Sequence, residues 1–81
     1  MTLSVGERLH AARDQKKISL EEACRVTKIQ RHILEAIEEG RLEEVLSLVY
    51  ARIFLKKYAA YLGLDGTAVV NEYLGGRSMV P

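Results

Sequence analysis

The stretch from Ser19 to Gly40 constrains this 81-residue chain most, because it reads as two short helices joined by a tight turn. Ser19 and Glu22 have the S-x-x-E spacing of a capping box, which predicts that a helix begins there. The helical pattern breaks near Lys28, and a second helix is predicted over about residues 30–39. Gly40 can end that helix in a left-handed conformation. The stretch therefore has the layout of a helix-turn-helix.

Three further helices are predicted around this motif, over about residues 5–16, 48–62 and 66–74. The intervening segment RLEEVLSL is predicted to be a linker. We therefore expect an all-α fold, a small five-helix repressor-like domain with the helix-turn-helix at helices 2 and 3. The domain is expected to cover residues 1–74. Residues 75–81, with two glycines, are expected to be a flexible tail or the artificial end of an expressed fragment.

The expected core follows from apolar residues that recur at helical spacing. It consists of Val5, Leu9, Ala12, Ile18, Ala23, Cys24, Ile29, Leu34, Ile37, Leu42, Leu55, Ala59, Leu62 and Val69. Tyr58 and Tyr61 stand at helical spacing with Tyr50 and Phe54, and core packing is the favoured interpretation for the first two. A domain of this size buries a modest core, so its stability should be on the order of 5 kcal/mol.

Composition and charge narrow the class of protein. The chain is 48% hydrophobic and 28% charged, which is ordinary for a soluble globular protein. Its single cysteine, Cys24, cannot form an internal disulfide, which fits a reducing cytosol. No run of about 18 apolar residues is present, so no transmembrane helix is predicted. The net charge is +1, yet residues 18–44 hold four basic and seven acidic side chains. The helix-turn-helix is thus acidic, the wrong sign for neutralising DNA phosphates.

Two separated motifs carry a resemblance to known families. The stretch Ser19–Gly40 resembles the Cro/repressor-like helix-turn-helix family. The chain continues as V-Y-A-R-x-F-L-K-K-Y-A-x-Y-L-G-L-D over Val49–Asp65. Together with S-L-E-E-A and T-K-I in the helix-turn-helix, this motif resembles the N-terminal cytoplasmic domain of the RodZ family of bacterial cell-shape proteins. The resemblance covers roughly residues 4–74.

This resemblance implies a protein-binding adaptor in bacterial cell-shape control. In RodZ proteins the domain is followed by a basic juxtamembrane segment, one transmembrane helix and an extracytoplasmic part, and it binds MreB, the bacterial actin homologue. The implied contact is the aromatic pair Tyr50 and Phe54, with Arg52 and Lys57 as a basic rim. The expected location is cytoplasmic, at the cytoplasmic face of the inner membrane. Membrane contact is expected only through segments outside this chain. Ile53 departs from the family, which often has glycine there.

The alternative function is a sequence-specific DNA-binding transcriptional regulator that uses the helix-turn-helix. The residues that would face the major groove are Gln30, Arg31, His32 and Glu35. Arginine can pair with guanine and glutamine with adenine, so part of this chemistry is suitable. The carboxylates of Glu35, Glu38 and Glu39 would meet phosphates unfavourably. Lys28 occupies a turn position where many such domains have glycine, and a left-handed backbone there would cost about 1 kcal/mol.

A diffuse basic patch and an enzyme are less favoured interpretations. Basic residues of two helices could form a diffuse patch for anionic lipid or an acidic protein; these are Arg8, Arg13, Lys56 and Lys57. An enzyme is not expected, because the chain has no glycine-rich phosphate loop and no nucleophile–base motif. His10 and His32 lie on different helices with no third ligand at metal-site spacing. We therefore expect no catalytic residue, no metal and no cofactor.

Overall fold

Residues 4–75 are described by the computed structural model, and every regular element in that range is an α-helix. The helices are α1 (Val5–Gln15), α2 (Leu20–Thr27), α3 (Arg31–Glu39), α4 (Leu42–Val45), α5 (Leu48–Tyr61) and α6 (Gly66–Gly75). The all-α prediction is confirmed. The expected count of five helices is wrong by one short helix, because α4 lies in the predicted linker. Its single turn, closed by a 3.0 Å bond from the Leu46 N–H to the Leu42 carbonyl, is too short to give a periodic pattern.

Local capping residues set the helix boundaries largely as predicted. Ser4 and Glu7 form a complete capping box at the start of α1. The Ser19 hydroxyl accepts a 3.0 Å bond from the Glu22 N–H, but the return bond of the box is not formed. Gly40 ends α3 in the left-handed region, at φ 76°. At the start of α6, the Asp65 carboxylate accepts a 3.2 Å hydrogen bond from the Ala68 N–H, as an N-cap residue should.

The turn of the helix-turn-helix is fixed by a buried threonine. The Thr27 hydroxyl donates to the Ala23 carbonyl at 2.6 Å and accepts from the Ile29 N–H at 3.2 Å. Lys28 follows in the left-handed region, at φ 64°. The bend between α2 and α3 is therefore closed from inside the core, while the Lys28 side chain is exposed to solvent.

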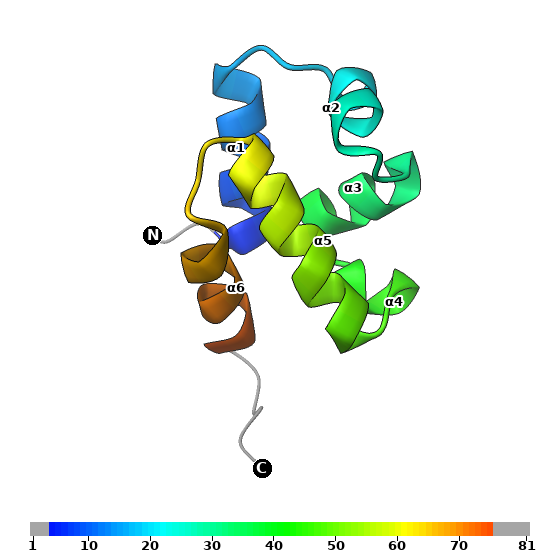
Figure 1. Cartoon of the computed structure of the whole chain (residues 1–81), viewed down its shortest axis with the longest axis vertical. Coiled ribbons are helices and arrows are strands. Elements are labelled where there is room, and N and C mark those ends of the chain that lie inside the picture. Colours follow the sequence, from blue (N-terminus) through cyan, green and yellow to red (C-terminus); the bar gives the residue numbers. More distant parts are fainter. Residues whose placement is uncertain (1–3, 76–81) are drawn as a thin grey trace.

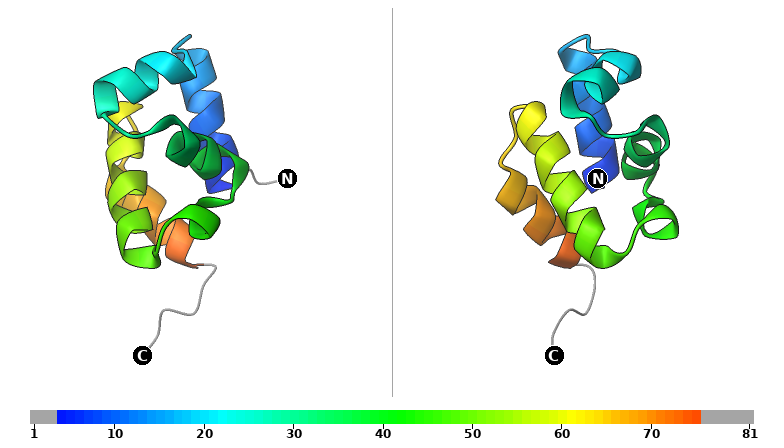
Figure 2. Two further views of the ribbon diagram at one scale, coloured as in Figure 1. Left: turned by 90° about the vertical axis from the view of Figure 1, so that its right-hand side faces the viewer. Right: turned by 45° about the vertical axis from the view of Figure 1, so that its right-hand side comes forward.

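The six helices of residues 4–75 pack around one core, with the most extensive contacts between α5 and α6 and between α1 and α3. In Figure 1, α5 crosses the front of the molecule with α6 beside it, and α1 lies behind. Figure 2 shows α1 beside α3 and α2. On another side α1 meets α6, where Arg8 forms an ion pair with Glu72. The first turn of α1 lies directly on α3 because Gly6 has no side chain. A Cβ at Gly6 would lie 2.5 Å from the Ile37 carbonyl oxygen, which no other residue could accommodate without movement.

Most of the expected core is buried, and the exceptions lie at its edge. Val5, Ala12, Ile18 and Cys24 are half-buried and pack against the core. Further buried residues were not in the expected set; they are Thr27, Ile33, Ala36, Ala51, Tyr58 and Val70. Tyr58 is fully buried, in agreement with its interpretation as a core residue, and Tyr61 is half-buried beside it with ring centroids 6.5 Å apart.

Candidate functional site

A hollow of about 390 Å³ lies between the first half of α5 and the turn of the helix-turn-helix. Its lining residues are Lys28, Gln30, Ile33, Leu46, Tyr50 and Phe54. Tyr50 stands at its mouth with 58% of its surface exposed, whereas Phe54 is half-buried and packs against the core. We call this feature the aromatic hollow. It offers one exposed ring, an apolar floor and a polar edge.

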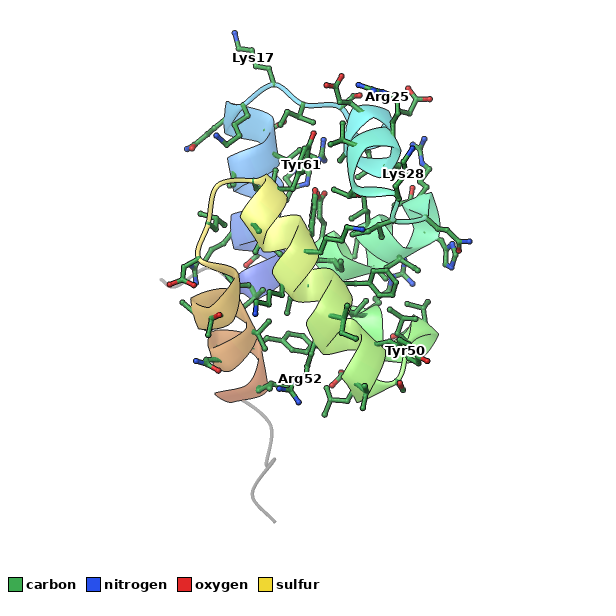
Figure 3. The ribbon with its side chains drawn as sticks, in the orientation of Figure 1. Lys17, Arg25, Lys28, Tyr50, Arg52 and Tyr61 are labelled. Atoms are coloured by element: carbon green, nitrogen blue, oxygen red, sulfur yellow. The ribbon has the colours of Figure 1, made fainter. Side chains whose placement is uncertain are left out.

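The structure separates the expected basic rim into two parts. Lys57 is seven residues after Tyr50 and three after Phe54, so helical spacing places it on the same side of α5, although it does not line the aromatic hollow. Arg52 points to the opposite side of α5 from Tyr50 (Figure 3). There it lines a second hollow, between α5 and α6. The structure thus brings Tyr50 and Phe54 together in one hollow, leaves Lys57 outside its lining and places Arg52 apart.

The residues proposed for DNA contact lie at the start of α3. Gln30 is the N-cap residue and lines the aromatic hollow, and His32 is exposed. Arg31 is held by Glu35 of its own helix, with 3.1 Å between Nε and Oε2. Gln30 was predicted to contact DNA and also lines the aromatic hollow. The candidate DNA-binding site and the candidate protein-binding site are therefore neighbouring parts of one surface. Lys28 also lines the hollow but was not among the predicted site residues. Its place in the turn was the only signal in the sequence that pointed to it.

The end of α3 differs from the sequence-based expectation. Glu38 was expected on the solvent face, yet its side chain is only 7% exposed and lies between α1, α3 and α5. Both of its oxygens accept from Arg13, at 2.8 Å from Nε and 3.0 Å from Nη2. His10 Nδ1 lies 2.8 Å away and the Tyr58 hydroxyl donates to Oε2. Glu38 is therefore an internal partner and would not face DNA phosphates.

The pKa values within this buried cluster follow from its geometry. Burial acts to raise the pKa of Glu38, but the bonds from Arg13, Tyr58 and His10 outweigh burial and hold that pKa below its ordinary value. Burial and the Glu38 carboxylate together raise the pKa of the Tyr58 phenol well above its ordinary value. The cluster is therefore a carboxylate surrounded by donors, which stabilises the packing of three helices.

The diffuse basic patch considered for lipid or protein does not form as one surface. Arg13 is only 12% exposed and is bound to Glu38. Arg8 forms an ion pair with Glu72 of α6. Of the residues considered for that patch, Lys56 and Lys57 alone are exposed and without an ion pair to any residue in the described part of the chain.

The described residues show little sign of other site chemistry. Within residues 4–75, no group of three or more His, Cys, Asp or Glu side chains is placed to hold a metal ion. Cys24 is half-buried at the edge of the core, and burial raises the pKa of its thiol, which disfavours the reactive thiolate. None of the helices in this range has both the length and the apolar character needed to span a membrane.

Comparison with known proteins agrees with this architecture. The chain is 40% identical over 73 residues to the cytoskeleton protein RodZ of Streptococcus pneumoniae, an overlap that covers 90% of this chain and 26% of that protein. It is 38% identical over 56 residues to the uncharacterized membrane protein YmfM of Bacillus subtilis, covering 69% of this chain and 19% of YmfM. This chain thus spans only a minor part of the length of either relative. No solved structure gives a significant match.

The family itself is identified by a match that covers most of the chain. Residues 8–69 match the family described as a helix-turn-helix domain, a range that runs from α1 into α6. This agrees with the two helices, the left-handed turn and the buried Thr27 described above. The chain therefore belongs to this helix-turn-helix family, as a domain of the RodZ N-terminal type.

Proposed function

We propose that this domain is a non-enzymatic adaptor that binds an MreB-like, actin-homologous filament through the aromatic hollow. The observation that carries the proposal is Tyr50, a large aromatic side chain that is 58% exposed at the mouth of a hollow. The relationship to a protein named as a cytoskeleton protein supports a cytoskeletal partner and a role in cell shape. As part of a longer protein, the domain would act at the cytoplasmic face of the membrane.

The chemistry of the aromatic hollow suits a protein surface. Tyrosine is enriched among the residues that dominate protein–protein binding, because its ring buries a large apolar area and its hydroxyl can still bond. Phe54, half-buried beneath it, is already held by the core and loses little freedom on binding. A protruding apolar side chain of the partner could enter between Tyr50 and Ile33.

Two cations flank this hollow and would orient an acidic partner. Lys28 lines the hollow. Lys57 is exposed, and helical spacing places it on the same side of α5 as Tyr50. Neither forms an ion pair with a residue in the described range, so both charges remain available. Such rim charges increase the association rate more than the final affinity. A contact of this size is weak alone, and repeated sites along a filament would raise its effective strength.

Co-sedimentation with polymerised MreB tests the proposal. The wild-type domain should pellet with filaments. Tyr50→Ala should weaken binding by about thirtyfold or more, as expected for the loss of a binding hot spot. The matched control is Val49→Ala, which changes the neighbouring residue, 65% exposed and outside the aromatic hollow. Wild-type binding by Tyr50→Ala, or an equal loss in both variants, would contradict the proposal.

A second function, DNA binding by α3, is favoured by one observation. Glu38 is withdrawn into the interior, so one of the three carboxylates that opposed phosphate contact is absent from the surface. Gln30 and His32 are exposed at the start of α3. If this function operates, duplex binding should fall steeply as salt rises, and Arg31→Ala should weaken it. The same change should leave filament binding nearly intact, which separates the two functions.

A further inference from the structure

A second surface lies on the opposite side of α5 and takes no part in the aromatic hollow. It is a hollow of about 290 Å³ between α5 and α6. Its lining residues are Val49, Arg52, Ile53, Lys56, Thr67, Val70 and Asn71. Val49 is 65% exposed and Ile53 is 56% exposed, so two aliphatic side chains project into solvent here. We call this the basic aliphatic surface.

The charge of this surface is entirely positive. Arg52 and Lys56 are exposed and form no ion pair with any other residue between 4 and 75. No carboxylate lines the hollow. The α6 carboxylate of Glu72 is engaged by Arg8 of α1, and Asp65 caps the start of α6. An occupant of this surface would therefore have to supply the negative charge.

The arrangement of side chains indicates what kind of occupant fits. Val49 and Ile53 are four residues apart on α5, as are Arg52 and Lys56, and each cation follows an aliphatic residue by three positions. Aliphatic and cationic groups therefore alternate along one face of the helix. The wall from α6 adds the neutral polar groups of Thr67 and Asn71. No aromatic ring lines this hollow, although aromatic anchors dominate protein–protein hot spots. Aliphatic groups beside Lys and Arg are instead typical of helices that lie at a lipid interface.

We propose that the basic aliphatic surface binds an anionic phospholipid bilayer, with Val49 and Ile53 entering the interface and Arg52 and Lys56 contacting lipid phosphates. This site is additional to the filament contact and does not depend on it. Figure 3 shows Tyr50 and Arg52 on opposite sides of α5, so a domain seated on a bilayer keeps its aromatic hollow open. The domain could then hold a filament and a membrane surface on either side of one helix.

Vesicle flotation tests this proposal without any filament protein. The wild-type domain should float with vesicles of phosphatidylglycerol and phosphatidylcholine and not with phosphatidylcholine alone. Arg52→Ala with Lys56→Ala should weaken binding by about twenty-five-fold, because each cation near an anionic bilayer contributes about fivefold. Val49→Ser with Ile53→Ser should also weaken binding, by about fivefold or more, because the apolar contact is lost. All four side chains are exposed, and circular dichroism checks that the variants fold.

The matched control removes the same charge elsewhere. Lys16→Ala with Arg25→Ala removes two exposed cations, one at the C-cap of α1 and one in α2, that do not line this hollow, and should leave flotation nearly unchanged. An equal loss in this control would show attraction by net charge alone and would overturn the proposal. Absence of flotation with anionic vesicles would also overturn it. So would binding of the domain to polyglutamate, through Arg52 and Lys56, without binding to vesicles. The filament assay contains no lipid, so either proposal can fail by itself.

Discussion

The two halves of α3 carry similar charged residues and use them in opposite ways. In the first half, Arg31 and Glu35 pair at 3.1 Å on the surface, where both side chains are more than a third exposed. In the second half, Glu38 is 7% exposed and is bound by donors from α1 and α5. The start of α3 therefore presents an exposed ion pair to solvent, whereas its end places the Glu38 carboxylate in the interior, where it holds three helices together.

This difference shows that charge on a sequence does not by itself indicate a binding surface. A surface pair contributes little stability, because water competes with it and both side chains lose freedom. A buried carboxylate must be fully bonded, because otherwise the lost hydration is not replaced. The first half of α3 is thus free to take part in recognition, whereas the second half is fixed by folding.

The largest expected difference between the two halves of α3 is in the free energy of unfolding after removal of Glu38 or of Glu35. Glu38→Ala should lower the free energy of unfolding by about 3 kcal/mol, because it leaves the Arg13 guanidinium and the Tyr58 hydroxyl without their buried partner. Glu35→Ala should change it by less than about 0.5 kcal/mol. Urea denaturation followed by circular dichroism measures both. Similar losses in the two variants would show that the comparison is wrong.

Acid should reproduce part of this loss in the unmodified protein. The folded-state pKa of Glu38 lies below its ordinary value of 4.5, so the unfolded chain binds the proton first as the pH falls. The stability that Glu38 contributes is therefore complete above 4.5 and disappears as the pH falls through the lowered folded pKa. Urea denaturation across this range measures the decline. Glu38→Gln should show a shallower decline, and an identical slope would exclude Glu38 as the cause.

The sequence predicted the parts of this fold that depend on neighbouring residues. Ser19 and Gly40 act through groups within a few positions, so they predicted where a helix begins and where one ends. Glu38 could not be placed, because its partners Arg13 and Tyr58 are 25 and 20 residues away and meet it only after three helices pack.

The candidate site divides in the same way. The shared face of Tyr50 and Phe54 was predicted from helical spacing. The separation of Arg52 required knowledge of where α6 lies, because that helix gives Arg52 a different hollow. The sequence placed Gly6 in a helix but could not predict its close contact with the Ile37 carbonyl, because that contact depends on how α1 approaches α3.

Removing one hydroxyl from the buried cluster should give an intermediate effect. Tyr58→Phe keeps the buried ring but deletes the donor to Glu38, so the free energy of unfolding should fall by about 1.5 kcal/mol. The control Tyr50→Phe deletes a hydroxyl from an exposed ring and should change stability by less than about 0.5 kcal/mol. Thermal or urea unfolding measures both, and the prediction fails if Tyr58→Phe is as stable as the wild type.

The smallest effect concerns the turn that leads into the exposed half of α3. Lys28 has φ 64°, a left-handed backbone that glycine adopts more easily, so Lys28→Gly should raise stability by about 1 kcal/mol. Lys17 has nearly the same conformation, at φ 57°, but does not line the aromatic hollow. Lys17→Gly should therefore stabilise similarly and leave filament co-sedimentation unchanged, whereas Lys28→Gly should weaken it. Equal binding by both variants would mean that Lys28 does not contact the partner, and the strained lysine would have no role in recognition.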